Sequence, residues 1–242
     1  MNNKIKKLIV LGASAYPEIS EIIYDINKVK KTYEVIYLLD DNEKLHNRKI
    51  EGVEVKGPLS LANKFPDDIR FIFSIGSHRT RLIRNEILKR LKIPTNRFET
   101  LIHPTAKIYS SAKISNGVII HPGSVISCNT KVGPFVIIVA NTIIGANNII
   151  GKGALITSLV STTSGVKIGS FSFIGTGAKI AENVEIGPGS LVSMGSDIHR
   201  NIAPGSIVFN TKKTKVIKGY ENVHIEIIEE WNKYKKISSY EN

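Results

Sequence analysis

The chain has 242 residues, a length that is typical of two domains. Its 33 basic and 21 acidic residues give a formal net charge of +12. Basic charge attracts phosphate-bearing ligands, but no basic face is interleaved with aromatic side chains, so we do not expect nucleic-acid binding. The single cysteine, Cys128, excludes an internal disulfide framework and favours a reducing compartment. The N-terminus reads as a strand and a glycine turn instead of a signal peptide, so we expect a cytoplasmic protein.

Residues 1–101 alternate strand and helix signals, which predicts a small Rossmann-like βαβ domain with a parallel sheet. Pro17 and Glu18 suit the opening turn of the first helix. The basic residues near the second helix are expected on its polar side: Arg79, Arg81, Arg84, Lys89 and Arg90. The expected elements are strands at 7–11, 33–39 and 68–75 and helices at 19–26 and 80–91.

Three signals in this domain suit a nucleotide. Residues 12–14 (Gly-Ala-Ser) lie between a strand and a helix, where backbone N–H groups bind phosphate well. Asp40 and Asp41 follow the second strand, where a carboxylate commonly accepts hydrogen bonds from a ribose or base. Gly76 ends a further strand, and the three signals are expected at the same sheet edge. The alternatives are a plain tight turn at 12–14 and a solvated loop pair at Asp40 and Asp41.

From Ile102 to Ile198, every sixth residue is Ile or Val, except for Thr162. The fourth residue after each of these is mostly small or β-branched, and Asn148 stands out among them. Each hexapeptide therefore buries one large and one small side chain. A short fixed period of this kind is typical of a parallel β-helix, which we expect over residues 102–206.

A second period of 18 residues predicts three hexapeptides per triangular coil, with residues 18 apart stacked at about 4.8 Å. Gly and Asn tolerate the positive φ that tight corners demand. We therefore expect corner roles for two columns at this spacing: Gly133, Gly151, Gly169 and Gly187, and Asn129, Asn147, Gly165, Asn183 and Asn201.

An uncharged stretch at 132–151 is long enough to suggest a membrane span. Its six-residue period favours buried β-helix sides instead, so we expect no membrane insertion. The tail, 207–242, contains a segment at 223–236 that predicts a short helix, with a docking stripe that includes Trp231.

The order of the motifs GAS, LLDD, SIG and LIHPTA, followed by hexapeptides, resembles the bacterial sugar acetyltransferases of the sialic-acid and pilin-glycosylation type. This resemblance covers nearly the whole chain. It implies a left-handed β-helix, acetyl transfer from acetyl-CoA to an activated sugar, and a homotrimer with coenzyme A between neighbouring β-helices. Relatives usually carry GGHG after the first glycines, so residues 15–17 (Ala-Tyr-Pro) are a departure. The resemblance places substrate contacts at Gly12, Ser14, Ala15, Tyr16, Asp40, Asp41 and Gly76, and coenzyme contacts at Leu155, Thr176 and Met194.

The catalytic motif departs further from this family. Relatives carry a histidine, an acidic residue and a cysteine just before an Ile-Gly step, with the histidine as general base. The matching step here is at 150–151, where Ala146, Asn147 and Asn148 stand at these three positions. The resemblance therefore leaves the catalytic residue unassigned.

Three interpretations remain open. An amine acceptor is already nucleophilic, with a pKa of roughly 8 for an α-amino group. Losing general-base help costs about 10²–10⁴-fold, so the missing histidine favours N-acetylation over O-acetylation. Alternatively, Cys128 or Glu182, which share the column of Ala146, acts instead, or Asn147 orients the acceptor from its corner. The third interpretation is a non-catalytic paralogue that binds nucleotide sugars.

His103 and His121 are 18 residues apart and are expected to stack as an outward-facing pair near the domain junction. Hexapeptide carbonic anhydrases bind zinc with three histidines. No third histidine has suitable spacing here, so we expect no metal site.

These observations together predict an α/β plus β protein: a homotrimeric, acetyl-CoA-dependent N-acetyltransferase of a nucleotide-linked amino sugar for surface polysaccharide biosynthesis. A sugar O-acetyltransferase and a non-catalytic binding protein are the alternatives. The sugar, the nucleotide, the acyl length and the base are left open.

Overall fold

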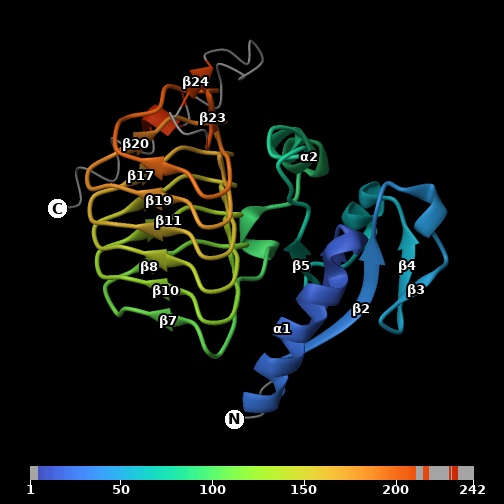
Figure 1. Cartoon of the computed structure of the whole chain (residues 1–242). Coiled ribbons are helices and arrows are strands. Elements are labelled where there is room, and N and C mark those ends of the chain that lie inside the picture. The colour runs from blue at the N-terminus through green and yellow to red at the C-terminus, as the bar shows by residue number, and fades with distance from the viewer. Residues whose placement is uncertain (1–4, 211–214, 218–228, 230, 234–242) are drawn as a thin grey trace.

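The computed structural model describes residues 5–210, 215–217, 229 and 231–233. An α/β unit at the N-terminus stands beside a parallel β-helix with three faces, and the colour order in Figure 1 shows the chain climbing the β-helix coil by coil. The β-helix is left-handed, so the expected fold class is confirmed.

The α/β unit contains the five expected elements at slightly different bounds, together with a short hairpin that the sequence pattern did not predict. Its sheet has the order β3-β4-β2-β1-β5, in which β3 is an antiparallel edge strand and the other neighbours are parallel. The elements are β1 (Lys6–Leu11), η1 (Ala13–Ala15), α1 (Tyr16–Val29), β2 (Tyr33–Leu39), η2 (Glu43–Leu45), β3 (Lys49–Ile50), β4 (Val53–Gly57), η3 (Leu59–Lys64), β5 (Arg70–Phe73), α2 (Ile83–Leu91) and η4 (Thr95–Arg97).

Short strands form three faces of the β-helix, and each strand pairs in parallel with the strand 18 residues away. The first face contains β6 (Leu101–Ile102), β9 (Ile119–Ile120), β12 (Ile137–Ile138), β15 (Leu155–Ile156), β18 (Phe173–Ile174), β21 (Leu191–Val192), β23 (Ile207–Phe209) and β24 (Lys215–Ile217). The second face contains β7 (Lys107–Ile108), β10 (Val125–Ile126), β13 (Ile143–Ile144), β16 (Ser161–Thr162), β19 (Lys179–Ile180) and β22 (Asp197–Ile198). The third face contains β8 (Lys113–Ile114), β11 (Lys131–Val132), β14 (Ile149–Ile150), β17 (Lys167–Ile168) and β20 (Glu185–Ile186).

The sixfold Ile and Val ladder forms the core of the β-helix. From Ile120 upward its members are at most 1% exposed, apart from Thr162 at 3%. The first members, such as Ile102 and Ile108, are only partly buried, since no coil covers them from below. The sequence pattern therefore predicted the inward face of every coil correctly.

The corners separate the two predicted columns. Asn129, Asn147, Gly165 and Asn183 do adopt positive φ, as expected. The other column, Gly133 to Gly187, does not have positive φ, so its expected role was wrong. A Cβ at any of its four glycines would lie under 3.0 Å from backbone atoms of the next coil. This column is glycine because the coils stack closely there.

The two residues that depart from the inward pattern are hydrogen-bonded to each other. Asn148 Nδ2 donates to Thr162 Oγ1 at 2.5 Å inside the core, and the N–H of Val166 donates to Asn148 Oδ1 at 2.7 Å. Thr162 Oγ1 also accepts from the N–H of Gly145 at 2.9 Å. Each departure therefore satisfies the polar group that the other one buries.

We expect the isosteric change Thr162→Val to lower the free energy of unfolding by about 1–3 kcal/mol, because Asn148 Nδ2 would be left buried without an acceptor. Urea unfolding of Thr162→Val, Asn148→Ala and the double variant measures the coupling. The double variant should lose less stability than the sum of the single variants. Additive losses would contradict this account of the pair.

The α/β unit packs on the first face of the β-helix through α1. Tyr16, Ile19, Ile22 and Ile23 of this helix share one buried cluster with residues of the sheet and of the first face: Leu8, Val10, Leu38, Ile72, Leu101, Ile119, Ile137 and Leu155. The opposite side of the sheet has its own apolar cluster, which reaches Phe135 of the β-helix. The apolar layer under α1 holds the two parts of the chain together.

Arg84 and Arg81 correct the expected polar side of the second helix, because they are 0% and 6% exposed. Arg84 lies between α2 and a corner of the β-helix. Its Nη2 donates to the carbonyl of Phe135 at 2.8 Å, and its Nη1 donates to the carbonyl of Gly153, one coil higher. Its guanidinium also lies 5.3 Å from the centre of the Phe73 ring. Burial lowers the pKa of Arg84 to about 9, so it is still protonated at neutral pH.

We expect Arg84→Lys to lower the free energy of unfolding by about 1–3 kcal/mol, because a single ammonium cannot span two carbonyls as the guanidinium fork does. Arg79→Lys, at an exposed site in the same segment, is the matched control and should change stability by less than about 0.5 kcal/mol. Urea midpoints at an unchanged m-value measure both effects. Equal stability of Arg84→Lys and the parent would contradict the assigned role.

The helix expected at 223–236 lies mostly outside the described residues. Glu229 and residues 231–233 are helical, and the Trp231 side chain is 1% exposed. A cavity beside it is also lined by residues 185–188 and 201–204 of the last coils. Within the described residues, no helix is long and apolar enough to cross a membrane.

Candidate functional site

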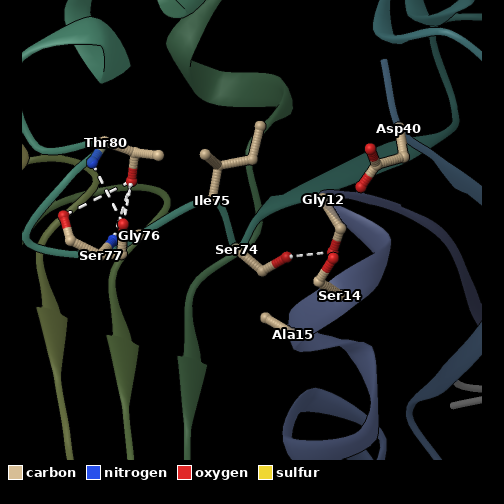
Figure 2. A pocket seen from close by; sticks show the side chains of 9 residues that line it. All are labelled: Gly12, Ser14, Ala15, Asp40, Ser74, Ile75, Gly76, Ser77 and Thr80. Carbon is tan, nitrogen blue, oxygen red and sulfur yellow. Dashed lines mark hydrogen bonds between the residues drawn. The ribbon is translucent and has the colours of Figure 1, made fainter. Parts of the chain in front are cut away.

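The best-defined cavity lies at the carboxyl edge of the α/β sheet, and we call it the sheet-edge cavity. Its volume is about 240 Å³, and it is open to solvent. It lies where β1 turns into α1, next to the ends of β2 and β5. Figure 2 shows its nine lining residues: Gly12, Ser14, Ala15, Asp40, Ser74, Ile75, Gly76, Ser77 and Thr80.

Asp40 holds the turn at the start of α1. Its Oδ2 accepts from the N–H of Ala13 at 2.8 Å, and its Oδ1 accepts from the N–H of Asn42 at 2.9 Å. A carboxylate has about four acceptor positions, so Asp40 can accept further hydrogen bonds from a ligand. In Figure 2 it lies at one end of the cavity, opposite Ser77 and Thr80.

The floor of the cavity is tightly packed around Gly12. This residue has φ 104°, and a Cβ there would lie 2.7 Å from Ile75 Cγ1. The buried Ser74 Oγ lies 2.9 Å from the Gly12 carbonyl and 3.0 Å from the Leu11 carbonyl, so it can donate to either. These contacts fix the spacing between the β1 turn and the β5 end, so the N-terminus of α1 is held facing the cavity.

The opposite rim is formed by Ser77 and Thr80 before α2. Thr80 Oγ1 accepts from the N–H of Ser77 at 2.9 Å, and Ser77 Oγ accepts from the N–H of Thr80 at 3.1 Å. The two hydroxyls lie 3.0 Å apart. This reciprocal pair stiffens the loop and presents hydroxyl groups beside the cavity.

Five of the seven substrate residues expected from the resemblance line this cavity: Gly12, Ser14, Ala15, Asp40 and Gly76. The other two lie elsewhere. Tyr16 is buried under α1, and burial together with the nearby Glu51 raises the pKa of its phenol. Asp41 accepts from the N–H of Leu59 at 2.9 Å and pairs with Arg90 at 2.5 Å.

Sequence reasoning missed Ser77 and Thr80, because only the fold brings the loop before α2 to this edge. Ser74 and Ile75 belong to the SIG motif that ends at Gly76, so the motif itself was the available signal.

A second, smaller cavity of about 100 Å³ lies between α1 and the first face, and we call it the interdomain cavity. It adjoins the sheet-edge cavity, since Ala15, Ser74 and Gly76 line both. A Cβ on Gly76 would lie 2.8 Å from Leu155 Cδ2, so glycine allows the two parts of the chain to approach closely here. The remaining lining residues are Glu18, Ile19, Ile119, His121, Ile137, Val139, Leu155, Thr157 and Phe173.

The two stacked histidines face outward from the coils, as expected, but α1 covers them, and they are only 6% and 7% exposed. His103 Nε2 lies 2.9 Å from Asp25 Oδ2, and its Nδ1 lies 2.8 Å from Thr105 Oγ1. The hydrogen bond with His103 is the main cause of a lowered pKa at Asp25. In the described part of the chain, no group of three or more His, Cys, Asp or Glu side chains could hold a metal ion.

Ala146 lies at the corner between the second and third faces, which is the corner opposite the first face. Hydrogen bonds connect the column through successive coils: the Asn147 N–H donates to the Cys128 carbonyl, and the Gly165 N–H donates to the Ala146 carbonyl, both at 2.9 Å. Asn147 has φ 58°, so it forms the corner. A catalytic role for Asn147, Cys128 or Glu182 stays a prediction, and all three lie on the side away from both cavities.

The three expected coenzyme residues lie on two different surfaces. Thr176 and Met194 stack on the corner between the first and second faces, where the N–H of Gly195 donates to the Thr176 carbonyl at 2.8 Å. Met194 is 72% exposed, and Leu159 on the same corner is 60% exposed. Leu155 instead lies in the wall of the interdomain cavity. Coenzyme contact at these positions stays a prediction.

Two family models match the chain. Residues 7–91 match the PglD N-terminal domain, and residues 124–158 match the bacterial transferase hexapeptide model of six repeats. These matches confirm the resemblance to hexapeptide-repeat sugar acetyltransferases. No curated protein sequence matches the chain.

Several solved structures share the fold. The acetyltransferase domain of PglB from Neisseria gonorrhoeae, in complex with acetyl coenzyme A, is 22% identical with a TM-score of 0.74, over 88% of this chain and 100% of that one. A mutant of perosamine N-acetyltransferase from Caulobacter crescentus, in complex with CoA and GDP-perosamine, is 20% identical with a TM-score of 0.73, over 88% and 97%. WeeI from Acinetobacter baumannii AYE is 18% identical with a TM-score of 0.57, over 87% and 99%. At these identities the similarity shows the fold.

We expect Gly12→Ala to lower the free energy of unfolding by about 1–3 kcal/mol more than Gly52→Ala, because the new Cβ would collide with Ile75. Gly52 is a matched control, since it also has positive φ, 78°, but a Cβ there meets nothing within 4 Å. Gly52→Ala should therefore cost only the left-handed backbone penalty of about 1–2 kcal/mol. Urea unfolding of both variants decides, and equal losses would contradict the packing account.

Proposed function

We propose that the protein is an acetyl-CoA-dependent N-acetyltransferase of a nucleotide-linked amino sugar, with a role in surface polysaccharide biosynthesis. The observation that carries this proposal is the sheet-edge cavity at the N-terminus of α1, with Asp40 on its rim and the β-helix beside it. Similar folds bind CoA and GDP-perosamine in one solved complex and acetyl coenzyme A in another. Both matched family models agree with this class of acyltransferase.

The cavity suits the nucleotide diphosphate of such a substrate. The N-terminus of α1 carries unpaired N–H groups and the positive end of the helix dipole, which favour phosphate oxygens. Asp40 retains acceptor positions for ribose or base hydrogens. With the nucleotide placed there, the linked sugar extends across the shared wall of Ala15, Ser74 and Gly76 toward the β-helix.

The coenzyme groove and the trimer belong to the same proposal. The exposed apolar corner of Leu159 and Met194, with Thr176 between them in coil order, suits the arm of coenzyme A. The corner of Ala146 lies opposite the first face, which the chain's own α/β unit covers. A site that uses both this corner and the sheet-edge cavity therefore needs a second copy of the chain, which favours a closed symmetric oligomer.

N-acetylation is favoured over O-acetylation because the corner offers no general base at Ala146. An amine attacks a thioester when it is neutral, whereas a hydroxyl needs proton removal during attack. The same corner also favours a second candidate, a non-catalytic protein that binds nucleotide sugars. The choice between them depends on turnover.

The test is incubation with acetyl-CoA and a panel of UDP-, dTDP- and GDP-linked amino sugars, followed by mass spectrometry. We expect one amino sugar to gain an acetyl group, while its hydroxyl counterpart does not. Acetylation of the hydroxyl counterpart would support the O-acetyltransferase instead. Binding of a nucleotide sugar without turnover would support the non-catalytic protein and overturn the enzyme.

A further inference from the structure

The two histidines under α1 are stacked and equally buried, but only one has hydrogen-bond partners for its ring. Both ring nitrogens of His103 are hydrogen-bonded, to Asp25 and Thr105. The ring of His121 has no hydrogen bond within the described residues, although the side chain is only 7% exposed. An unpaired buried polar group is costly to a fold, so a free imidazole at this position indicates that it serves a ligand.

His121 faces the interdomain cavity. The walls around it are mostly apolar, and the other ionisable side chain among the lining residues is Glu18, which is exposed in the opening turn of α1. The volume of about 100 Å³ corresponds to roughly three water molecules at ~30 Å³ each. That space admits one edge of a sugar ring with its substituent, but not a nucleotide.

The surroundings of His121 keep its imidazole neutral. Burial is the main cause of a pKa below the usual value, the nearby His103 lowers it further, and Glu18 acts in the opposite direction. The remaining ionisable groups lie farther out: Asp25 is bonded to His103, and the exposed His78 packs on Phe173 of the cavity wall. Since its pKa lies below 6.5, His121 gains a charge only as the pH falls through that lower value, and near pH 7 it carries a free lone pair.

We propose that the interdomain cavity is the acceptor subsite, in which Glu18 and His121 hold the amino group of the sugar and His121 acts as the general base. This inference rests on the proposed function, because it assumes a nucleotide-linked sugar in the adjoining sheet-edge cavity. The base on the first face would replace the histidine that is missing at Ala146 on the opposite corner.

The transfer step balances with the thioester as the second reactant. The neutral amine nitrogen forms a bond to the thioester carbonyl carbon, and the C–S bond then breaks, releasing the coenzyme thiolate. The proton lost by the nitrogen passes to His121, and from there to the thiolate or to solvent. Glu18 orients the amine and stabilises the positive charge that develops on it.

The first experiment measures recognition of the amine without turnover. Calorimetry compares UDP-, dTDP- and GDP-linked 4-amino sugars with their 4-hydroxy counterparts. The parent protein should bind one amino sugar at least about 10-fold more tightly than its counterpart, since a hydrogen bond to a charged group is worth this much. Glu18→Gln and His121→Asn should each reduce this preference to near onefold. His78→Asn, at an exposed histidine beside the same wall, should retain it.

The second experiment measures kinetics with the preferred sugar. His121→Asn should lower kcat about 10²–10⁴-fold, as expected for loss of a general base, while the KM for acetyl-CoA stays unchanged. Thermal unfolding checks that the variants are folded. Glu18→Gln alters an exposed side chain, so it tests the subsite even if His121→Asn fails to fold.

The outcomes separate the two proposals. Binding or acetylation of an amino sugar that both variants leave at the parent level would overturn the acceptor subsite alone. If the parent protein neither binds nor acetylates any sugar of the panel, the proposed function fails, and the subsite fails with it. Loss of amine preference in the variants, with nucleotide binding retained, supports the subsite.

Discussion

The parallel stacking of coils at a repeat of 18 residues is the constraint on which the rest of the structure depends. Each coil pairs with the next through backbone hydrogen bonds, and the sixfold Ile and Val side chains stack inside. Burial of this core is worth roughly 1.5–3 kcal/mol per large side chain. Because the interior is satisfied by the coil alone, the outward side chains of the three faces are free to serve other purposes.

The first face uses this freedom to carry the α/β unit. Its outward residues Ile119, Ile137 and Leu155 join the apolar cluster under α1, and Gly76 lets the sheet edge approach Leu155. Arg84 connects the same unit to two successive coils. A rigid β-helix thus holds the N-terminus of α1 at a fixed place, and the two adjoining cavities follow from that contact.

Sequence patterns anticipated the periodic parts of this architecture and the nucleotide side of the candidate site. The ladder, the Asn corners and the motifs at Gly12, Asp40 and Gly76 depend on local geometry, so single residues report them. The buried positions of Arg84 and His121 could not be anticipated in this way. Each depends on a surface brought from elsewhere in the chain, α2 against a corner for Arg84 and α1 over the first face for His121.

The sequence by itself determined the fold class, the coil repeat and the absence of a histidine at Ala146, because these follow from periods and residue types along the chain. The tertiary structure alone decided which outward side chains become buried and which cavities form between the α/β unit and the β-helix. The physical reason is that the hexapeptide pattern specifies only the inward residues. The environment of an outward residue such as His121 depends on which element packs over it.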